Sequence, residues 1–344
     1  ASDVYKRQAQ ITGFMENTEV SGREVESLAA EKEDDTVLLG GMPVGIYMET
    51  DGVLVLDTEK MTGMDGKEYT PAQGVVSSGD YITEVNHQKI EGKKQLMDLV
   101  EHLDGEKVLL TVRRENTILE KKLTPVQISK GNYRLGIWVR DNVQGLGTIT
   151  FLTKNNRFAA LGHGIHDIDT STLLTIKRGT LYRTSIQKVQ KGSKGNPGTM
   201  EGIIVYNRFH QLGVIEKNTD AGIYGELNSD RSWIGEEVPI QVAKKEEIKT
   251  GEARIRCYID GEVKEYTICI TQIDKESDQV NKGMVIQVTD TELLEKTGGI
   301  IQGMSGSPII QNGKLIGAVT HVFVQDSTKG YGIFIENMLK EEES

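Results

Sequence analysis

Apolar and polar positions alternate in short runs along most of this 344-residue chain, and Gly is frequent between the runs. Alternation with a period of two is typical of β-strands that have one buried face. Such segments dominate the chain from Tyr133 onward, where helical patterns are almost absent. Many short strands in succession predict a mainly β architecture, either a sandwich or a pair of barrels. The clearest segments are 135–139, 147–152, 203–206, 212–216, 238–242, 253–259 and 263–270.

One helical pattern stands out earlier in the chain. Within residues 93–103 apolar side chains recur at spacings of three and four, which predicts an amphipathic helix ended by an Asp-Gly pair. A Gly-Asp turn at 79–80 opens a strand before this helix, and a strand at 107–114 follows it. We therefore expect a small α/β domain at 37–126 and a β-rich domain at 127–344, after a polar lead-in at 1–36.

The predicted domain at 37–126 resembles a bacterial PDZ domain, because a Gly-rich loop and a strand precede the Gly-Asp turn, the helix and the last strand. In PDZ domains an extended peptide adds to a sheet edge beside the helix, and loop N–H groups hold its carboxylate. By this resemblance the peptide-binding residues are Gly40, Gly41, Gly45, Ile46, Tyr47 and Met48. The alternative is a packing module without a ligand, since a lone Gly-rich loop is a weak signal.

The charge balance argues against a nucleic-acid partner. With 40 basic and 51 acidic residues the net charge is −11, whereas phosphate binding depends on clustered Lys and Arg. The chain also has no run approaching the roughly 20 apolar residues that cross a bilayer. Its start, 1–10, lacks the apolar core of a signal peptide and does not begin with Met. We expect that a native N-terminal anchor is absent from this sequence.

The two cysteines lie in one predicted hairpin whose turn is Asp260-Gly261. Pairing Ile259 with Glu262 would place Cys257 opposite Lys264, so the hairpin does not bring the two sulfur atoms together. We therefore expect two buried free thiols. Two lone cysteines also give no recurring metal motif, and we expect neither a metal nor another cofactor.

The sharpest chemical motif is Gly303–Pro308, which reads Gly-Met-Ser-Gly-Ser-Pro and precedes an apolar strand. A nucleophilic Ser needs a hydroxyl exposed on a tight turn, and flanking Gly residues let the chain take that shape. We interpret Ser305 as the nucleophile. By comparison with the loop of trypsin-like proteases, the N–H groups of Gly303 and Ser305 would form the oxyanion hole. The alternative is that Gly and Ser only form a turn between strands.

A second motif places His163 directly after the small-residue strand Phe158–Leu161, as in the Ala-Ala-x-His element of trypsin-like proteases. His163 would take the proton from the nucleophile and later give it to the leaving amine. His166 is a rival for this role. We prefer His163 because it lies between two Gly residues, where a substrate can approach most easily. A His-x-x-His-Asp string could also indicate zinc, but further paired ligands are lacking.

A third group should orient the imidazole and stabilise its charged form. The residues alone leave Asp167, Asp169, Asp220 and Asp290 open. Asp290 ends a strand that leads toward the nucleophile motif, where a carboxylate could be held. Its alternative role is the N-cap of a short helix at 291–296, since Asp is a favoured cap.

Together these motifs resemble the SpoIVB family of endospore-forming bacteria, serine peptidases with a PDZ domain and a trypsin-like double β-barrel. The resemblance covers most of the chain, from about Leu38 to Leu339. The stretches that carry it are Leu161–Gly164, Gly192–Gly198, Gly222–Gly225, Gln302–Pro308, Thr320–Val324 and Gly330–Gly332. What the resemblance implies is a triad of His163, Asp290 and Ser305, and this resemblance alone selects Asp290.

The resemblance also implies a biological role. Members of that family are exported from the forespore to the space between two membranes, where they cleave themselves. They then cut a membrane-bound regulator of an intramembrane protease, which leads to activation of a sporulation sigma factor. The expected partners are therefore protein substrates, including the chain itself, without nucleic acid or a small-molecule cofactor.

Two other classes of function stay open from the sequence. The chain could be an inactive protease scaffold that signals through its PDZ-like domain, because a fold does not fix a function. Retention of His163, Asp290 and Ser305 together speaks against that class. An acyl hydrolase is a third possibility, but the Gly-x-Ser-x-Gly elbow on a strand-to-helix turn is absent.

Overall fold

The computed structural model describes residues 36–344, so the predicted lead-in lies outside the described residues except for Thr36. Nearly all regular structure in this part is β, as the alternating pattern predicts. None of the described helices has the length and apolar composition that crossing a membrane requires.

Six strands close a first barrel through pairings that run β2–β13–β16–β17–β12–β11 and return to β2. Its interior contains Met48, Ile149, Phe158, Leu181 and Ile223. These side chains come from alternate positions of their strands, which is how a small barrel fills its centre. The strands are β2 (Pro43–Thr58), β11 (Ile137–Leu152), β12 (Arg157–Ala160), β13 (Ile176–Tyr182), β16 (Gln211–Thr219) and β17 (Gly222–Leu227).

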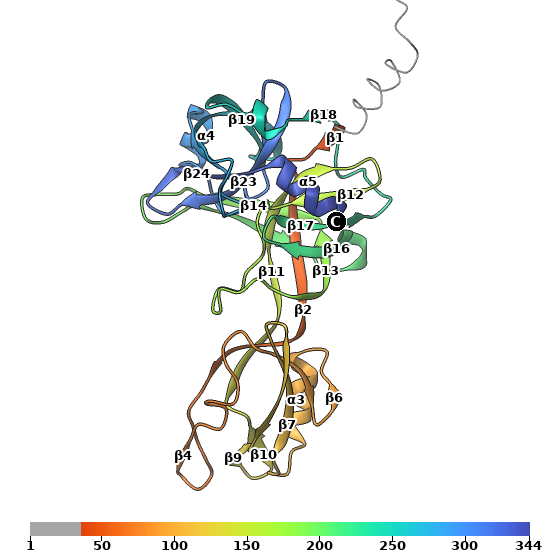
Figure 1. The fold of residues 1–344 in the computed structure, drawn as a ribbon, viewed down its shortest axis with the longest axis vertical. Coiled ribbons are helices and arrows are strands. Elements are labelled where there is room, and N and C mark those ends of the chain that lie inside the picture. The colour runs from red at the N-terminus through yellow and green to blue at the C-terminus, as the bar shows by residue number, and fades with distance from the viewer. Residues whose placement is uncertain (1–35) are drawn as a thin grey trace, which may run out of the picture. The chain divides into compact units, whose positions relative to one another are not determined.

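A second ring of six strands runs β19–β20–β21–β24–β23–β22 and returns to β19. Ile255, Tyr266, Ile286, Ile309 and Val319 fill its interior. The predicted double β-barrel is therefore confirmed (Figure 1). The strands are β19 (Gly251–Ile259), β20 (Glu262–Ile273), β21 (Met284–Val288), β22 (Pro308–Gln311), β23 (Lys314–Phe323) and β24 (Asp326–Phe334).

Several shorter elements accompany the barrels. Strands β1 and β18 pair with β11 and β23, and β14 and β15 form a separate hairpin. Helix α4 precedes the nucleophile motif, and α5 ends the chain. Their bounds are β1 (Thr36–Leu39), β14 (Thr184–Gln190), β15 (Thr199–Ile204), η1 (Arg208–His210), β18 (Pro239–Val242), η2 (Lys245–Glu247), α4 (Thr291–Thr297) and α5 (Ile335–Glu343).

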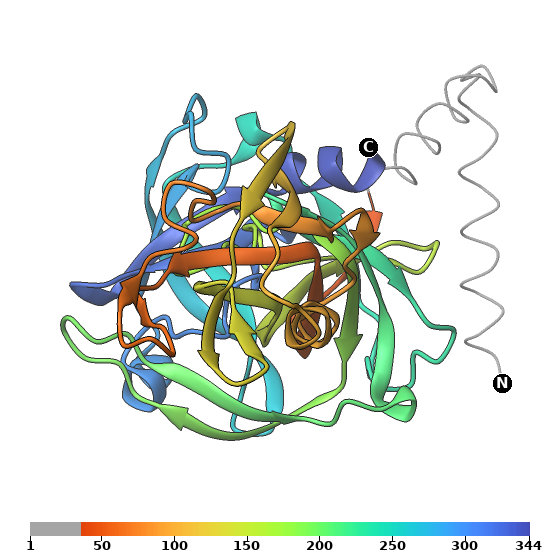
Figure 2. The ribbon, with the colours of Figure 1, turned by 90° about the horizontal axis from the view of Figure 1, so that it is seen from below.

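Residues 51–139, which we call the inserted module, have an apolar core of their own that includes Val55, Ile82, Leu96 and Leu110. Its sheet runs β11–β2–β5–β7–β8, and one helix packs on it, seen almost along its axis in Figure 2. The elements are β3 (Met61–Thr62), β4 (Glu68–Tyr69), β5 (Tyr81–Val85), β6 (Gln88–Lys89), α3 (Lys93–Glu101), β7 (Val108–Arg114), β8 (Thr117–Leu123), β9 (Val126–Ser129) and β10 (Asn132–Arg134).

The start of the PDZ-like domain differs from the prediction. Strand β2 belongs to the first barrel over its first half and to the inserted module over its second half, and β11 does the same in reverse. Residues 37–50 are thus barrel residues rather than part of the predicted domain at 37–126. The Gly-rich pattern at 40–45 misled the sequence argument, because such a loop is equally suited to a barrel corner.

The predicted peptide-receiving edge at Ile46–Met48 is wrong for a related reason. These residues pair with β11 on one side and with β13 on the other, so they expose no free edge. A Cβ on Gly40 would lie 2.1 Å from the carbonyl oxygen of Ile149, and one on Gly45 would meet the side chain of Ile204. Gly40, Gly41, Gly45, Ile46, Tyr47 and Met48 therefore pack in and around the first barrel and do not form a carboxylate-binding loop.

The predicted cysteine hairpin is confirmed in its register. Strands β19 and β20 pair Ile259 with Glu262 and Cys257 with Lys264, with the turn at Asp260-Gly261. Both thiols are free, although Cys269 is half-buried rather than buried. Burial raises the pKa of the Cys257 thiol to about 12, so this sulfur atom stays protonated and unreactive at neutral pH.

Candidate active site

Ser305 lies on the tight loop between α4 and β22, at the entrance to the second barrel. Gly303 and Gly306 flank it with φ values of +106° and +94°, in the region that favours Gly. A Cβ on Gly306 would lie 2.1 Å from the carbonyl oxygen of Thr148 and 2.5 Å from the amide nitrogen of Leu161. Both contacts are with the first barrel, so Gly306 is required where the two barrels meet.

Strand β11 of the first barrel donates hydrogen bonds to carbonyl groups of the loop that carries Ser305. The hydroxyl of Thr148 donates to the carbonyl of Gly303 at 2.8 Å, and that of Thr150 donates to Gly306 at 2.8 Å. The amide of Thr148 also donates to the carbonyl of Ser305 at 2.9 Å. Three hydrogen bonds from β11 thus engage the carbonyl groups of Gly303, Ser305 and Gly306, and the amide groups of the loop are not used in these contacts.

The amide groups of Gly303 and Ser305 donate no hydrogen bond within residues 36–344, whereas those of Met304, Gly306 and Ser307 all do. An unpaired N–H group is uncommon in a tightly packed loop. Two such groups beside a nucleophile can bind a developing oxyanion. This is the pair that the sequence motif predicts.

The hydroxyl of Ser305 donates to the carbonyl oxygen of Thr320 at 2.9 Å. Thr320 lies in β23, and the register of β23 against β24 shifts between Val319 and Val322. Such a bulge turns a peptide group out of the regular ladder and often occurs beside an active site. In this structure the Ser305 proton is therefore directed to Thr320 rather than to an imidazole.

His163 follows β12, and its Nδ1 lies 2.9 Å from the carbonyl oxygen of Gly164. Because a carbonyl only accepts, the neutral ring carries its proton on Nδ1 and leaves the lone pair of Nε2 free. Burial lowers the pKa of His163, the Gly164 hydrogen bond opposes this, and His166 lowers it further. A neutral imidazole with a free Nε2 is the form that can act as a base.

The rival His166 is exposed at the surface and lies outside the cavity that His163 lines. Its Nδ1 is 3.2 Å from the carbonyl oxygen of Gly164, and its Nε2 is 3.4 Å from a carboxylate oxygen of Asp220. His166 therefore supports the turn behind His163. No group of His, Cys, Asp and Glu residues suited to a metal occurs in the described part of the chain.

A cavity of about 390 Å³ joins these residues: Ser305, His163 and Thr320 lie on its wall. Most of the other lining side chains are apolar, and none of the lining residues is acidic or carries a Lys or Arg charge. The apolar lining residues are Ile46, Val143, Leu146, Leu161, Ile165, Ile300, Ile301 and Val322. A volume of this size can hold a side chain of an extended peptide.

Asp290 does not take the orienting role in this structure. Its Oδ1 accepts from the amide of Leu293 at 3.1 Å and its Oδ2 from that of Thr267 at 3.2 Å, so it caps helix α4. Within the described chain no hydrogen bond or ion pair joins Asp290 to His163. The structure thus shows the helix-cap alternative that the sequence left open.

The other acidic candidates are also engaged elsewhere. Arg140 of β11 binds both Asp167 and Asp169 through its two terminal nitrogens, and the Asp167 carboxylate is fully buried. Asp167 further accepts from the amides of Asp169 and Thr170. This buried ion pair fixes the segment that follows His163. Among the described residues, no carboxylate contacts the imidazole of His163.

The nearest aromatic neighbour of His163 is a residue that sequence reasoning missed. The ring centroid of His321 lies 4.6 Å from that of His163, with 33° between the planes. His321 lines the same cavity, and burial lowers its pKa to about 4. Thr148, Thr150 and Thr320 were missed as well. A single Thr or His carries no local signal for contacts that span more than 100 residues.

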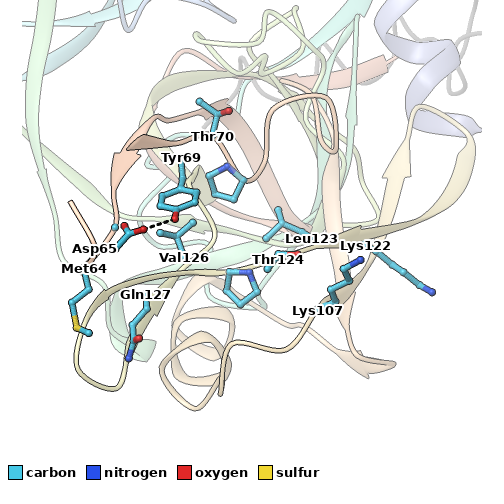
Figure 3. A pocket seen from close by; sticks show the side chains of 13 residues that line it. Met64, Asp65, Tyr69, Thr70, Lys107, Lys122, Leu123, Thr124, Val126 and Gln127 are labelled. Carbon is cyan, nitrogen blue, oxygen red and sulfur yellow. Dashed lines mark hydrogen bonds between the residues drawn. The ribbon is translucent and has the colours of Figure 1, made fainter. Parts of the chain in front are cut away.

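The inserted module carries two further hollows that contain neither Ser305 nor His163. One, of about 720 Å³, lies between the β3–β4 turn and residues 122–127, where the Tyr69 hydroxyl donates to Asp65 at 2.8 Å (Figure 3). The other is a groove of about 370 Å³ between α3 and the start of β11. Residues 137–140 pair with β2 on one edge, and no other described strand pairs with them.

Two closed β-barrels with a serine and a neutral histidine on one cavity wall are the arrangement typical of the trypsin-like class of serine peptidases. The model of the SpoIVB peptidase S55 family matches residues 131–339, more than half of the chain. The chain belongs to that family.

Individual proteins resemble the chain more weakly. A Helicobacter pylori protein named "Putative zinc metalloprotease" is 31% identical over 110 residues, which are 28% of this chain and 31% of that protein's length. The PDZ domain of an SdrC-like protein of Listeria monocytogenes is 24% identical over 26% of this chain and 87% of its own, with a TM-score of 0.21. The active form of the Rv3671c protease of M. tuberculosis is 15% identical over 58% and 73%, with a TM-score of 0.31.

Proposed function

We propose that this endopeptidase uses Ser305 as its nucleophile, His163 as its base, and the amides of Gly303 and Ser305 as its oxyanion hole. The observation that carries the proposal is that Gly303, Ser305 and His163 line one cavity, and that the amides of Gly303 and Ser305 donate no hydrogen bond within residues 36–344. The neutral His163 tautomer has its lone pair on Nε2, which is the atom that must receive the proton.

The reaction proceeds in two halves. The Ser305 oxygen attacks the scissile carbonyl carbon while its proton moves to Nε2 of His163, and the oxyanion is held by the two amides. The C–N bond then breaks as His163 gives this proton to the leaving amine. In the second half a water molecule repeats the sequence on the acyl-enzyme, which releases the acid and restores Ser305. Before the first step the Ser305 hydroxyl must turn from Thr320 towards His163.

The finer biological role is also part of the proposal. Family membership supports a protease that cleaves itself and then a membrane-bound regulatory protein in the pathway that activates a sporulation sigma factor. It likewise supports export from the forespore to the space between its two membranes.

The inserted module would bind an extended peptide, but at a different edge from that predicted. Residues 137–140 of β11 have one edge unpaired, and α3 flanks this edge with Leu96, Met97 and Val100. Gly136, with φ of +68°, gives the chain a turn just before the strand. A free strand edge beside a helix supports strand addition, with side chains of the peptide placed against the helix.

A pair of methionine variants tests this groove. Met97 and Met64 are both exposed, at 51% and 61%, but only Met97 lines the groove. A library of decapeptides with free C-termini should bind the wild type and the Met64→Glu variant and should bind Met97→Glu more weakly. Equal binding by both variants would place the peptide elsewhere, and a C-terminally amidated copy of the best binder shows whether the carboxylate matters.

The first test of catalysis compares wild type with Ser305→Ala and Ser307→Ala for self-cleavage and for cleavage of an unfolded protein such as reduced casein. Ser307 lies in the same loop, and its buried hydroxyl has no partner in the described structure, so its loss should leave cleavage intact. Ser305→Ala and His163→Ala should each remove cleavage. Cleavage that survives in Ser305→Ala would assign the nucleophile to another residue.

A non-catalytic binding role is the second candidate. Two observations favour it. The Ser305 hydroxyl donates to Thr320, and among the described residues no carboxylate forms a hydrogen bond or ion pair with His163. If wild type and Ser305→Ala both leave reduced casein intact, while peptides still bind the groove, this second role takes precedence.

A further inference from the structure

The base of this site has no acidic partner in the described chain. Asp167 and Asp169 bind Arg140, Asp220 faces His166, and Asp290 caps α4. The Gly164 carbonyl sets which nitrogen of His163 carries the proton. A carbonyl fixes a tautomer, but as a neutral dipole it stabilises an imidazolium less than a carboxylate does. Among the described residues, the groups in contact with the His163 ring are therefore the ones placed to support the charge that His163 gains during catalysis.

The group that lies against the His163 ring is His321. The two ring centroids are 4.6 Å apart with 33° between the planes, which is a tilted stack. The bulge in β23 that turns the Thr320 carbonyl towards Ser305 also places His321, the next residue, beside the base. One short stretch of chain thus contacts both the nucleophile and the base.

His321 is held in its neutral form. Its Nδ1 is buried and has no hydrogen-bond partner in residues 36–344, so no described acceptor stabilises a proton on that atom. The titratable and charged groups around it are His163, Lys282 and His166, and each opposes a further positive charge. Burial and these groups together lower its pKa to about 4. At neutral pH His321 is therefore uncharged.

A cation over the face of a neutral aromatic ring is stabilised, and more so where water is excluded. We propose that His321 is a positioning residue for His163: its neutral ring fixes the plane of the base and stabilises the imidazolium that forms when Ser305 transfers its proton. This inference rests on the proposed function.

The test compares His321→Phe with His321→Leu, because both fill the space but only Phe keeps an aromatic face. His321→Leu should lower kcat about tenfold with little change in KM, the size expected for a partly buried cation on a ring. His321→Phe should stay within about threefold of wild type. Since the stack favours the charged form of His163, its loss should also move the acid limb of kcat/KM down by about half to one pH unit in His321→Leu alone.

Thermal unfolding of each variant shows whether its fold is retained, and His321→Met serves as a second aliphatic variant should Leu lower the midpoint strongly. The inference is overturned if the aliphatic and Phe variants match wild type in kcat and in the acid limb. It is also overturned if His321→Phe loses as much as His321→Leu, because a ring nitrogen would then be responsible. Failure of the proposed function looks different, since wild type would then cleave no better than Ser305→Ala.

Discussion

The Thr148 hydroxyl of the first barrel donates a 2.8 Å hydrogen bond to the carbonyl of Gly303, one of the two residues beside the nucleophile whose amide groups donate no hydrogen bond within residues 36–344. Thr148 is buried, so water does not compete for this bond. The geometry of the proposed oxyanion hole in the second barrel therefore depends on a side chain of the first. This contact explains why the two barrels must be assembled before the site exists.

Thr148→Val should reduce kcat by about tenfold to a hundredfold, since a buried carbonyl that loses its donor costs about 1–3 kcal/mol and the loop is free to shift. The change should act on kcat more than on KM, because the oxyanion forms only during the reaction. Thr148→Ser keeps the hydroxyl and should retain most activity. A Thr148→Val variant with wild-type kcat would show that the loop is held without this bond.

A pair of glycine variants separates crowding from backbone strain. Gly306 and Gly313 both have positive φ, at +94° and +76°, but a Cβ meets backbone atoms only at Gly306. Gly313→Ala should cost about 1 kcal/mol for the conformation alone. Gly306→Ala should cost several times more or prevent folding, since the first barrel cannot move away. Denaturant unfolding checks both, and equal losses would contradict a tight contact at Gly306.

Short sequence patterns correctly predicted those features that depend on neighbouring residues in the chain. The register of the cysteine hairpin follows from its turn, and it is found as predicted, with Cys257 opposite Lys264. The helix expected at 93–103 is observed as α3 at Lys93–Glu101. The motifs around His163 and Ser305 are also local, because each depends on adjacent small residues that open a turn. Both residues line one cavity, as these motifs suggest.

The sequence alone did not predict which strands far apart in the chain pair with each other. The Gly-rich run at 40–45 fits a carboxylate loop or a barrel corner equally well, and only the pairing of Ile46 with Gly145 and Leu181 decides between them. An Asp before a short helix is likewise ambiguous at Asp290. The contacts of Thr148 and His321 arise from packing between the barrels or around the cavity, and no periodicity in the chain encodes them.

If His163 is the base, as we propose, its burial sets the pH range of activity. The base must be neutral to accept a proton, and burial lowers its pKa below the ordinary value of 6.5. Activity should therefore persist below pH 6.5 and decline only as pH falls through the lowered pKa. The acid limb of kcat/KM measures this. His210→Asn, which removes a half-buried imidazole outside the cavity, should leave the limb unchanged, and a limb above pH 6.5 in wild type would contradict burial of the base.

The same two histidines should make the fold less stable in acid. His163 and His321 have lowered pKa values in the folded chain, so between pH 6.5 and about 4 the unfolded chain binds more protons. Stability should thus be full above pH 6.5 and fall as pH decreases towards 4. For His321 the loss is on the order of 2 kcal/mol, reduced from the full linkage value because the ring is partly exposed. Urea unfolding of His321→Phe should show a shallower acid decline than wild type.

Substitutions at Asp290 distinguish a role in helix capping from a role in catalysis. Asn caps helices about as well as Asp, so Asp290→Asn should preserve stability to within about 0.5 kcal/mol and, because no described contact links it to His163, should preserve kcat. Asp290→Ala should lose about 0.5–2 kcal/mol of stability with the same chemistry at Ser305. If Asp290→Asn instead lowers kcat by about 10⁴-fold, as an orienting carboxylate does in trypsin-like sites, then Asp290 must leave its cap and reach His163 during the reaction.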